Sequence, residues 1–263
     1  MGTPPDYPIA IHALGSQAEY EACVELQRIT WGDDFRELVA PALLQIAQKV
    51  GGVAAGAFVD DRLVGFVFGL TGIQGGSPVH WSHMLAVAVP HRDQGIGRRL
   101  KEYQRGQILA LGVRRMRWTY DPLVARNAHL NLERLGVRIV EYVRDMYGET
   151  PMSRTSGIIG TDRFVVEWDL TENARAQDPG PPNGSDTSPL IARLDDPLPH
   201  AATVRIGIPD DIQALKDEDP TRALAWRAST RRAFEHYLGH GYAVAAFHRQ
   251  RGQATWYRLD RYV

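Results

Sequence analysis

A glycine-rich segment flanked by arginines is the part of the chain best suited to chemistry. Residues 92–98 read Arg-Asp-Gln-Gly-Ile-Gly-Arg and follow an apolar run, residues 84–89, that contains the β-branched Val87 and Val89. The two glycines allow a tight backbone turn in which several N–H groups converge on one small volume. A helix that begins there adds unpaired N–H groups and the positive end of its dipole. The segment therefore predicts a site for an anion of about the size of a pyrophosphate.

Two familiar phosphate motifs do not fit this segment. A dinucleotide-binding fingerprint needs a third glycine where the chain has Leu100, and a P-loop needs Lys followed by Ser or Thr where the chain has Arg98 and Arg99. The structural alternative is a glycine turn that only opens a surface helix.

The segment does match Arg/Gln-x-x-Gly-x-Gly/Ala at the end of a strand, and in this it resembles the GCN5-related N-acetyltransferase (GNAT) superfamily. The resemblance implies that the turn binds the pyrophosphate of acetyl-CoA and that the backbone of the preceding strand pairs with the pantetheine arm. It also implies that a backbone amide within residues 86–89 stabilises the oxyanion of the reaction. The cofactor contacts implied in this segment are Val87, Val89, Arg92, Gln94, Gly95, Ile96, Gly97 and Arg98.

The elements expected around the segment follow the GNAT order. Apolar spacing and turn residues predict strands over residues 8–13, 53–59, 63–70, 114–121, 137–146 and 163–170, and helices over residues 19–27, 37–49, 97–111 and 127–136. The resemblance covers roughly residues 8–171 and implies a mixed, mostly antiparallel twisted sheet flanked by helices. Two points stay open: the loop over residues 71–78 is an ordinary turn or a substrate lid, and Trp31 and Phe35 are core residues or acceptor contacts.

The rest of the chain predicts a linker and an extension. Residues 172–189 are dense in Pro, Gly, Asn, Asp and Ser and have little to bury. Beyond them we expect a strand over residues 203–208, a turn or short helix over 209–219, a helix over 221–238 and a hairpin of 242–248 with 254–259. Roughly 70 residues form only a marginal core alone. We therefore expect a GNAT-like domain of residues 1–171 and a small α/β extension, residues 190–263, that packs on it or on a partner subunit.

His83 and Asp121 are the candidate catalytic residues upstream and downstream of the turn. Acyl transfer to an amine needs a base for the amine and often a proton for the leaving thiolate. His83 precedes Val87 by four residues, on the same face of the expected strand, and a neutral imidazole suits a base near neutral pH. Asp121 ends the next strand and could act as base or bind a cationic amine. Both residues have a structural alternative: a lone histidine in a strand is more often a hydrogen-bonded structural residue, and Asp121 could equally be a turn former or helix cap.

One segment departs from the GNAT pattern Asn-x-x-Ala-x-x-x-Tyr-x-x-x-Gly, whose Tyr serves as a proton donor near the CoA sulfur. When the chain is aligned on Gly136, Ala125 takes the Asn position and Leu132 the Tyr position, so the usual donor is missing. The departure puts the general acid in doubt, though not the cofactor. Neighbouring residues that could bind the cofactor or donate a proton are Asn127, Asn131, Tyr142 and Tyr147.

Composition limits the kinds of partner that we expect the protein to bind. The formal net charge of −1 argues against a nucleic-acid or anionic membrane partner, and the arginines of residues 92–117 are explained by a phosphate-rich cofactor. The single cysteine, Cys23, excludes an internal disulfide framework, and the nine histidines lack metal-binding spacing, so no metal is expected. No signal peptide or bilayer-spanning run is visible, so we expect a cytoplasmic protein.

These observations together predict an acyl-CoA-dependent N-acetyltransferase that transfers acetyl directly from acetyl-CoA, or another acyl-CoA, to an amine. The chain resembles a GNAT subgroup of predicted acetyltransferases with a C-terminal extension, and its acceptor is a small-molecule or peptide amine. The alternative is a GNAT fold that binds acyl-CoA as a sensor without catalysis, consistent with Leu132. The sequence leaves open whether the protein forms a homodimer.

Overall fold

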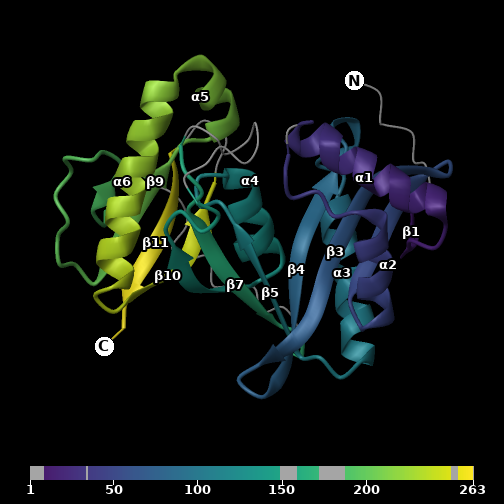
Figure 1. Ribbon diagram of the computed structural model, residues 1–263. Coiled ribbons are helices and arrows are strands. Elements are labelled where there is room, and N and C mark those ends of the chain that lie inside the picture. The colour runs from purple at the N-terminus through teal and green to yellow at the C-terminus, as the bar shows by residue number, and fades with distance from the viewer. Residues whose placement is uncertain (1–8, 34, 149–158, 172–186, 250–253, 263) are drawn as a thin grey trace. The chain divides into compact units, whose positions relative to one another are not determined.

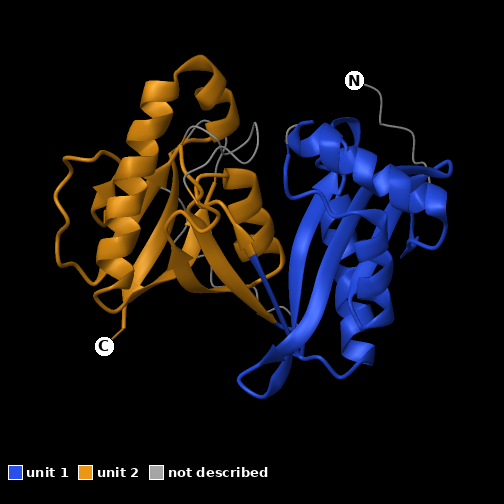
Figure 2. Ribbon diagram, viewed as in Figure 1, with its two compact units in different colours: residues 1–118, 169–171 blue, residues 119–168, 172–263 orange. Residues whose placement is uncertain are grey.

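The chain divides into two compact units. The computed structural model describes residues 9–33, 35–148, 159–171, 187–249 and 254–262. Unit 1 comprises residues 1–118 and 169–171, and unit 2 comprises residues 119–168 and 172–263 (Figure 2). Residues 119–168 thus share a compact unit with the predicted C-terminal extension, and most of the predicted linker lies outside the described residues.

Unit 1 is built on a sheet whose strands follow one another in chain order. They are β1 (Ala10–Ala13), β2 (Val53–Val59), β3 (Arg62–Gln74), β4 (Ser77–Val87) and the first part of β5 (Arg115–Tyr120). The first four are antiparallel neighbours. Strand β5 instead runs parallel to β4, and their register comprises His80↔Met116 and Trp81↔Arg117, near the start of both strands.

Helices cover both faces of this sheet (Figure 1). Helices α1 (Gln17–Trp31) and α2 (Pro41–Lys49) enclose a core with Phe66, Phe68 and Met84 from β3 and β4. Helix α3 (Ile96–Ala110) lies on the other face, where a Cβ added at Gly65 would meet Leu100. Trp31 stacks on Phe35 with ring centroids 5.3 Å apart, and Phe35 is buried in the core. Core packing therefore accounts for both aromatic residues.

Three predicted boundaries in unit 1 were wrong for local reasons. The loop expected over residues 71–78 is the end of the β3–β4 hairpin, which turns at Gly75 and Gly76, both at positive φ. Strand β4 ends at Val87, because Pro90 lies in a 3-10 turn, Val89–His91. Helix α2 begins at Pro41, a favoured first helical residue, rather than at residue 37.

Within the described residues, unit 2 contains a strand pair, a small four-stranded sheet and four helical segments. The pair is β6 (Arg138–Val143) with β7 (Arg163–Asp169), and the sheet has the order β10-β11-β9-β8. Its strands are β8 (Leu190–Ile191), β9 (Thr203–Ile208), β10 (Tyr242–His248) and β11 (Thr255–Arg261). The helical segments are α4 (Ala125–Ala128), the π-helical η2 (His129–Arg134), α5 (Ile212–Glu218) and α6 (Pro220–Leu238).

An aromatic core joins residues 119–168 to the C-terminal extension. Phe164 of β7 packs edge-on against Phe234 of α6 at 4.8 Å and against Tyr257 of β11 at 5.6 Å between ring centroids. Tyr142 of β6 contacts the same Phe164 and Phe234 rings. The extension therefore packs on the second half of the predicted GNAT-like domain.

The predicted fold class is confirmed. The strand pairs whose register is described are antiparallel apart from β4 with β5 and β8 with β9, and helices flank the sheets (Figure 1). The C-terminal extension has the expected mixture of strands and helices. Within the described ranges, every helix is too short or too polar to cross a bilayer.

We predict that Phe164→Ala lowers the free energy of unfolding by about 3–5 kcal/mol, because it leaves a cavity where elements of both chain segments meet. Urea unfolding followed by circular dichroism measures this. Leu224→Ala is the control, since Leu224 on α6 is 47% exposed and its truncation should cost under about 1 kcal/mol. A loss below about 1 kcal/mol for Phe164→Ala would contradict the shared core.

Candidate functional site

The glycine turn of unit 1 has the backbone geometry of an anion site. Gly95 is the N-cap of α3 and adopts a left-handed conformation with φ of 77°. The first N–H groups of a helix have no partner within it, and among the described residues no side chain caps α3. A Cβ at Gly95 would meet no described atom within 4 Å, so the space beside this glycine is open.

Some side chains around the turn bind backbone carbonyls, whereas others are exposed or buried in the core. Arg92 Nε donates to Val87 O at 3.0 Å, and Gln94 Nε2 donates to Pro90 O at 3.2 Å, so both tie the turn to the end of β4. Arg98 is exposed on the first turn of α3, while Ile96 is buried beneath it. Arg99, which follows Arg98, donates to Ile9 O at 2.7 Å instead.

His83 sits at an irregularity of β4. The register with β3 shifts there, because Ser82 pairs with Gly69 and Met84 pairs with Phe68, which leaves His83 as the extra residue of a bulge. Bulges re-aim a side chain and are common beside active sites. The His83 ring lies edge-on to Phe68 with centroids 6.2 Å apart.

The imidazole of His83 is neutral near pH 7. Although solvent reaches the side chain, the protein atoms packed around the ring lower the pKa of His83 below its ordinary 6.5, and attraction to Glu37 opposes this only in part. A neutral ring has one nitrogen free of a proton, which a base requires.

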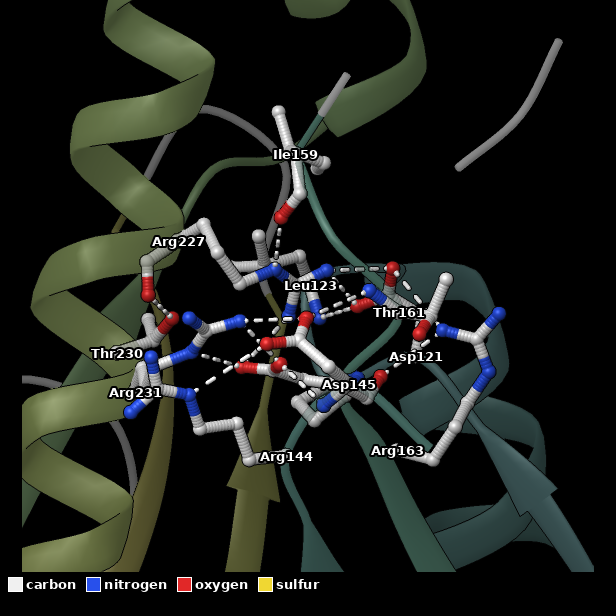
Figure 3. Close-up of polar contacts among 12 residues, drawn as sticks. Asp121, Leu123, Arg144, Asp145, Ile159, Thr161, Arg163, Arg227, Thr230 and Arg231 are labelled. Atoms are coloured by element: carbon white, nitrogen blue, oxygen red, sulfur yellow. Dashed lines mark hydrogen bonds and ion pairs between the residues drawn. The ribbon is translucent and has the colours of Figure 1, made fainter. Parts of the chain in front are cut away.

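Asp121, in unit 2, is held by an arginine from the C-terminal extension (Figure 3). Arg227 Nη2 of α6 donates to Asp121 Oδ1 at 2.8 Å and to Oδ2 at 2.7 Å, and the Leu123 N–H donates to Oδ1 at 2.9 Å. Arg163 Nη1 lies 3.8 Å from Oδ2. Asp121 is 9% exposed and Arg227 is 3% exposed, so the pair is buried.

Tyr142 joins the same buried group through Asp162. Its hydroxyl donates to Asp162 Oδ2. Arg231 of α6 donates to both Asp162 oxygens, at 2.9 and 2.6 Å, and to Asp145 Oδ1 at 2.8 Å. Because Arg227 Nη1 lies 3.9 Å from Asp162 Oδ2, the structure brings the predicted Asp121 and Tyr142 into one charged cluster.

The cluster fixes the protonation of its members. Burial alone would raise the pKa of Asp162, but hydrogen bonds from Arg231 and Tyr142 and the charge of Arg227 outweigh it and lower the pKa below 3.8. Burial, together with the charge of Asp162, raises the pKa of the Tyr142 hydroxyl. At neutral pH Asp162 is therefore ionised and Tyr142 keeps its proton.

The remaining predicted residues of unit 2 lie in the segment before β6. Asn127 is half-buried in α4, whereas Asn131 of η2 is buried and its backbone carbonyl accepts from the Val137 N–H at 3.1 Å. Leu132, at the position of the usual proton donor, is 1% exposed. Tyr147 OH lies 3.1 Å from Thr119 Oγ1.

Arg227 and Arg231 are the site residues that the sequence reasoning missed. Ala223, Thr230 and Ala233 lie on the buried face of α6, and Arg227 is buried on the same helix. Four-residue spacing puts Arg227 and Arg231 next to each other on the helix surface. Two arginines within a buried stripe are a usable signal, since such residues are almost never buried without partners.

Comparisons with known proteins give a family for part of the chain. Residues 20–136 match the sequence model of the acetyltransferase (GNAT) family. A search of curated proteins found no match to the chain.

Several solved acetyltransferase structures are similar to the chain. A chain of the NatC complex bound to Gag peptide and CoA is 14% identical, with a TM-score of 0.50 over 62% of this chain and 99% of that chain. Aminoglycoside 6′-acetyltransferase type Ii is 19% identical, with a TM-score of 0.49 over 62% and 99%. The ribosomal-protein-S18-alanine N-acetyltransferase from Escherichia coli is 16% identical, with a TM-score of 0.48 over 63% and 96%. At such identities the likeness to the NatC chain concerns the fold alone.

We predict that Arg231→Met destabilises unit 2 by about 3 kcal/mol at about pH 7, because it leaves the buried Asp162 charge with less compensation. Ionised Asp162, with its lowered pKa, stabilises the fold above 3.8, and this contribution is lost as the pH falls through the folded-state pKa. The difference in free energy of unfolding between wild type and variant should therefore be smaller at about pH 3. Urea unfolding at both pH values measures it.

The control for this prediction is Arg232→Met on the same helix. Arg232 Nη1 donates to a backbone carbonyl, that of Asp196, at 2.9 Å, so its loss leaves no buried carboxylate behind. A stability difference for Arg231→Met that stayed constant between the two pH values would contradict the role of Asp162.

Proposed function

We propose that this protein, whose residues 20–136 form a domain of the GNAT acetyltransferase family, is an acyl-CoA-dependent N-acyltransferase that acts on a small-molecule or peptide amine. The observation that carries the proposal is the turn from β4 into α3. There, a helix start without a side-chain cap, a left-handed glycine with open space beside it and the exposed Arg98 follow one another within four residues. These features suit the pyrophosphate of CoA.

Residues of the turn and of β4 would hold the acyl donor. The N–H groups of Ile96, Gly97 and Arg98 and the guanidinium groups of Arg92 and Arg98 would contact the pyrophosphate. The backbone of Val87 and of Val89, which lies in the 3-10 turn after β4, would contact the pantetheine arm. When bound, the acyl-CoA supplies an activated acyl group as a thioester.

His83 is the proposed base. Its side chain is solvent-accessible, lies on the bulge of β4 and carries a neutral imidazole near pH 7. It can therefore take a proton from an ammonium acceptor and leave a nucleophilic amine. Both oxygens of Asp121 already accept hydrogen bonds from Arg227, which favours a positioning role for this residue.

Tyr142 is the proposed proton donor. Its hydroxyl stays protonated at neutral pH, as a general acid must, but burial and the charge of Asp162 raise its pKa, so it is a weaker acid than an ordinary tyrosine while it donates to Asp162. Binding of acyl-CoA without transfer is the second candidate function, and the buried Leu132 at the usual donor position favours it. Release of CoA thiol over a panel of primary amines separates the two: turnover on any amine supports the transferase, and binding without turnover supports the sensor.

We predict that Arg98→Ala weakens CoA binding roughly tenfold, because one charge-assisted hydrogen bond contributes about 1.5–3 kcal/mol. Isothermal titration calorimetry with CoA measures the dissociation constant. Arg28→Ala is the matched control, since Arg28 is exposed on α1 and pairs only at 3.5 Å with Glu25 among the described residues. Equal affinity of wild type and Arg98→Ala would remove Arg98 from the site.

We predict that His83→Gln lowers kcat/KM by roughly 10²- to 10⁴-fold, the usual contribution of a general base. With wild type, kcat/KM should rise with pH through a pKa below 6.5 and then level, because only neutral His83 accepts a proton. The variant should lose this acid limb. Thiol release over a pH series measures both effects. His12→Gln is the control, because the His12 ring stacks on Phe58 with ring centroids 4.2 Å apart and is not part of the proposed site. An unchanged profile would exclude His83 as the base.

A further inference from the structure

A lysine is buried in unit 1 beside the strand proposed to bind the acyl donor. Lys101 lies in the second turn of α3 and is 4% exposed. Its Nζ donates to Ser82 Oγ of β4 at 2.7 Å and lies 3.7 Å from the centroid of the Trp118 ring of β5. The amine thus touches both of the parallel strands from the α3 side.

The surroundings of Lys101 disfavour its charged form. Among the described residues, no carboxylate forms an ion pair with Lys101. Nearby His80 is neutral near pH 7, because burial is the main cause that lowers its pKa to about 4. Burial lowers the pKa of Lys101 itself well below 10.5. A neutral amine is nucleophilic, whereas an ammonium group is not.

Lys101 contacts β4 where the thioester of the acyl donor would lie. The parallel register of β4 with β5 ends at Trp81↔Arg117, and Ser82 and Trp118 are the next residues. Ser82 also precedes the His83 bulge. From Val87, near the proposed pyrophosphate site, back to Ser82 the strand spans roughly 17 Å at about 3.4 Å per residue. An extended pantetheine arm covers such a span, so its sulfur end falls near Ser82 and His83.

We propose that Lys101 is an internal acyl acceptor, acylated by the protein's own bound acyl-CoA; this inference rests on the proposed function. The Nζ lone pair adds to the thioester carbonyl carbon, so a C–N bond forms and the C–S bond breaks. The sulfur leaves as the CoA thiolate and takes the surplus proton from Nζ, through the Ser82 hydroxyl that already accepts from Nζ. The products are an amide on Lys101 and CoA thiol, without any oxidant or reductant.

The chain contains its own controls, because it has only three lysines, Lys49, Lys101 and Lys216. Lys49 is the exposed last residue of α2 and reports direct chemical acylation from solution. Lys216, in α5 of unit 2, is buried like Lys101, and burial likewise lowers its pKa. It separates the effect of burial from the effect of position beside β4.

The experiment incubates the full chain with acetyl-CoA and quantifies acetylation of each lysine by peptide mass spectrometry against time and concentration. We expect Lys101 to be acetylated at least roughly tenfold faster than Lys49 or Lys216, because a bound thioester acts at high effective concentration. Its rate should saturate with acetyl-CoA. S-acetyl-N-acetylcysteamine has the thioester but no pyrophosphate, and it should modify Lys49 in preference to Lys101. Ser82→Ala should slow the acetylation of Lys101.

Calorimetry with CoA on the same preparation separates the possible failures. CoA binding without preferential acetylation of Lys101, or equal labelling by both thioesters, overturns this inference and leaves the proposed function standing. Failure to bind CoA overturns the proposed function and the inference with it. Lys101→Met keeps a side chain of similar length but offers no acylable amine, so it should bind CoA and show no acetylation at residue 101.

Discussion

The buried guanidinium of Arg227 imposes the strictest constraint on unit 2, because arginine cannot escape its charge by losing a proton. Removing such a charge from water costs several kcal/mol unless carboxylates and hydrogen bonds compensate it. Asp121 supplies that compensation through two hydrogen bonds, and Asp162 adds a second negative charge nearby. Helix α6 is therefore fixed by charge to the residues after β5 and before β7.

The buried basic residue of unit 1, Lys101, has surroundings that differ from those of Arg227. Lys101 is as deeply buried as Arg227, yet among the described residues it has a hydroxyl and an indole ring beside it in place of a carboxylate. Lysine can shed its proton when water is removed, and arginine cannot. Similar burial thus accompanies a fixed ion pair in one unit and a lysine whose pKa is lowered in the other.

The proposed acyl-donor site and the groups proposed to act on the donor depend on different features of the chain. The donor half depends on backbone geometry, namely a glycine N-cap, a strand end and a bulge, and side-chain identity matters little for most of it. The base, the acid and the acceptor contacts depend on individual side chains. The proposed acid, Tyr142 of unit 2, is held by the C-terminal extension, because Arg231 donates to Asp162 and Asp162 accepts from Tyr142. The extension is thus part of the architecture around the proposed acid.

The sequence by itself determined the features that depend on local spacing. The turn at residues 92–98, the strand over Thr203–Ile208 and the helix now seen as Pro220–Leu238 were readable because glycine conformation and apolar periodicity are local properties. The family resemblance, carried by that turn and the element order, was readable for the same reason.

Only the tertiary structure decided which polar residues meet. Asp121 and Arg227 are 106 residues apart in the chain, and Asp162 and Arg231 are 69 apart, so no spacing rule could pair them. Lys101 has a different reason: its position in α3 was evident, but the loss of water around it depends on packing against β4 and β5. Burial and charge pairing are properties of the assembled fold, and for that reason the chemistry of these side chains could not be read from the sequence.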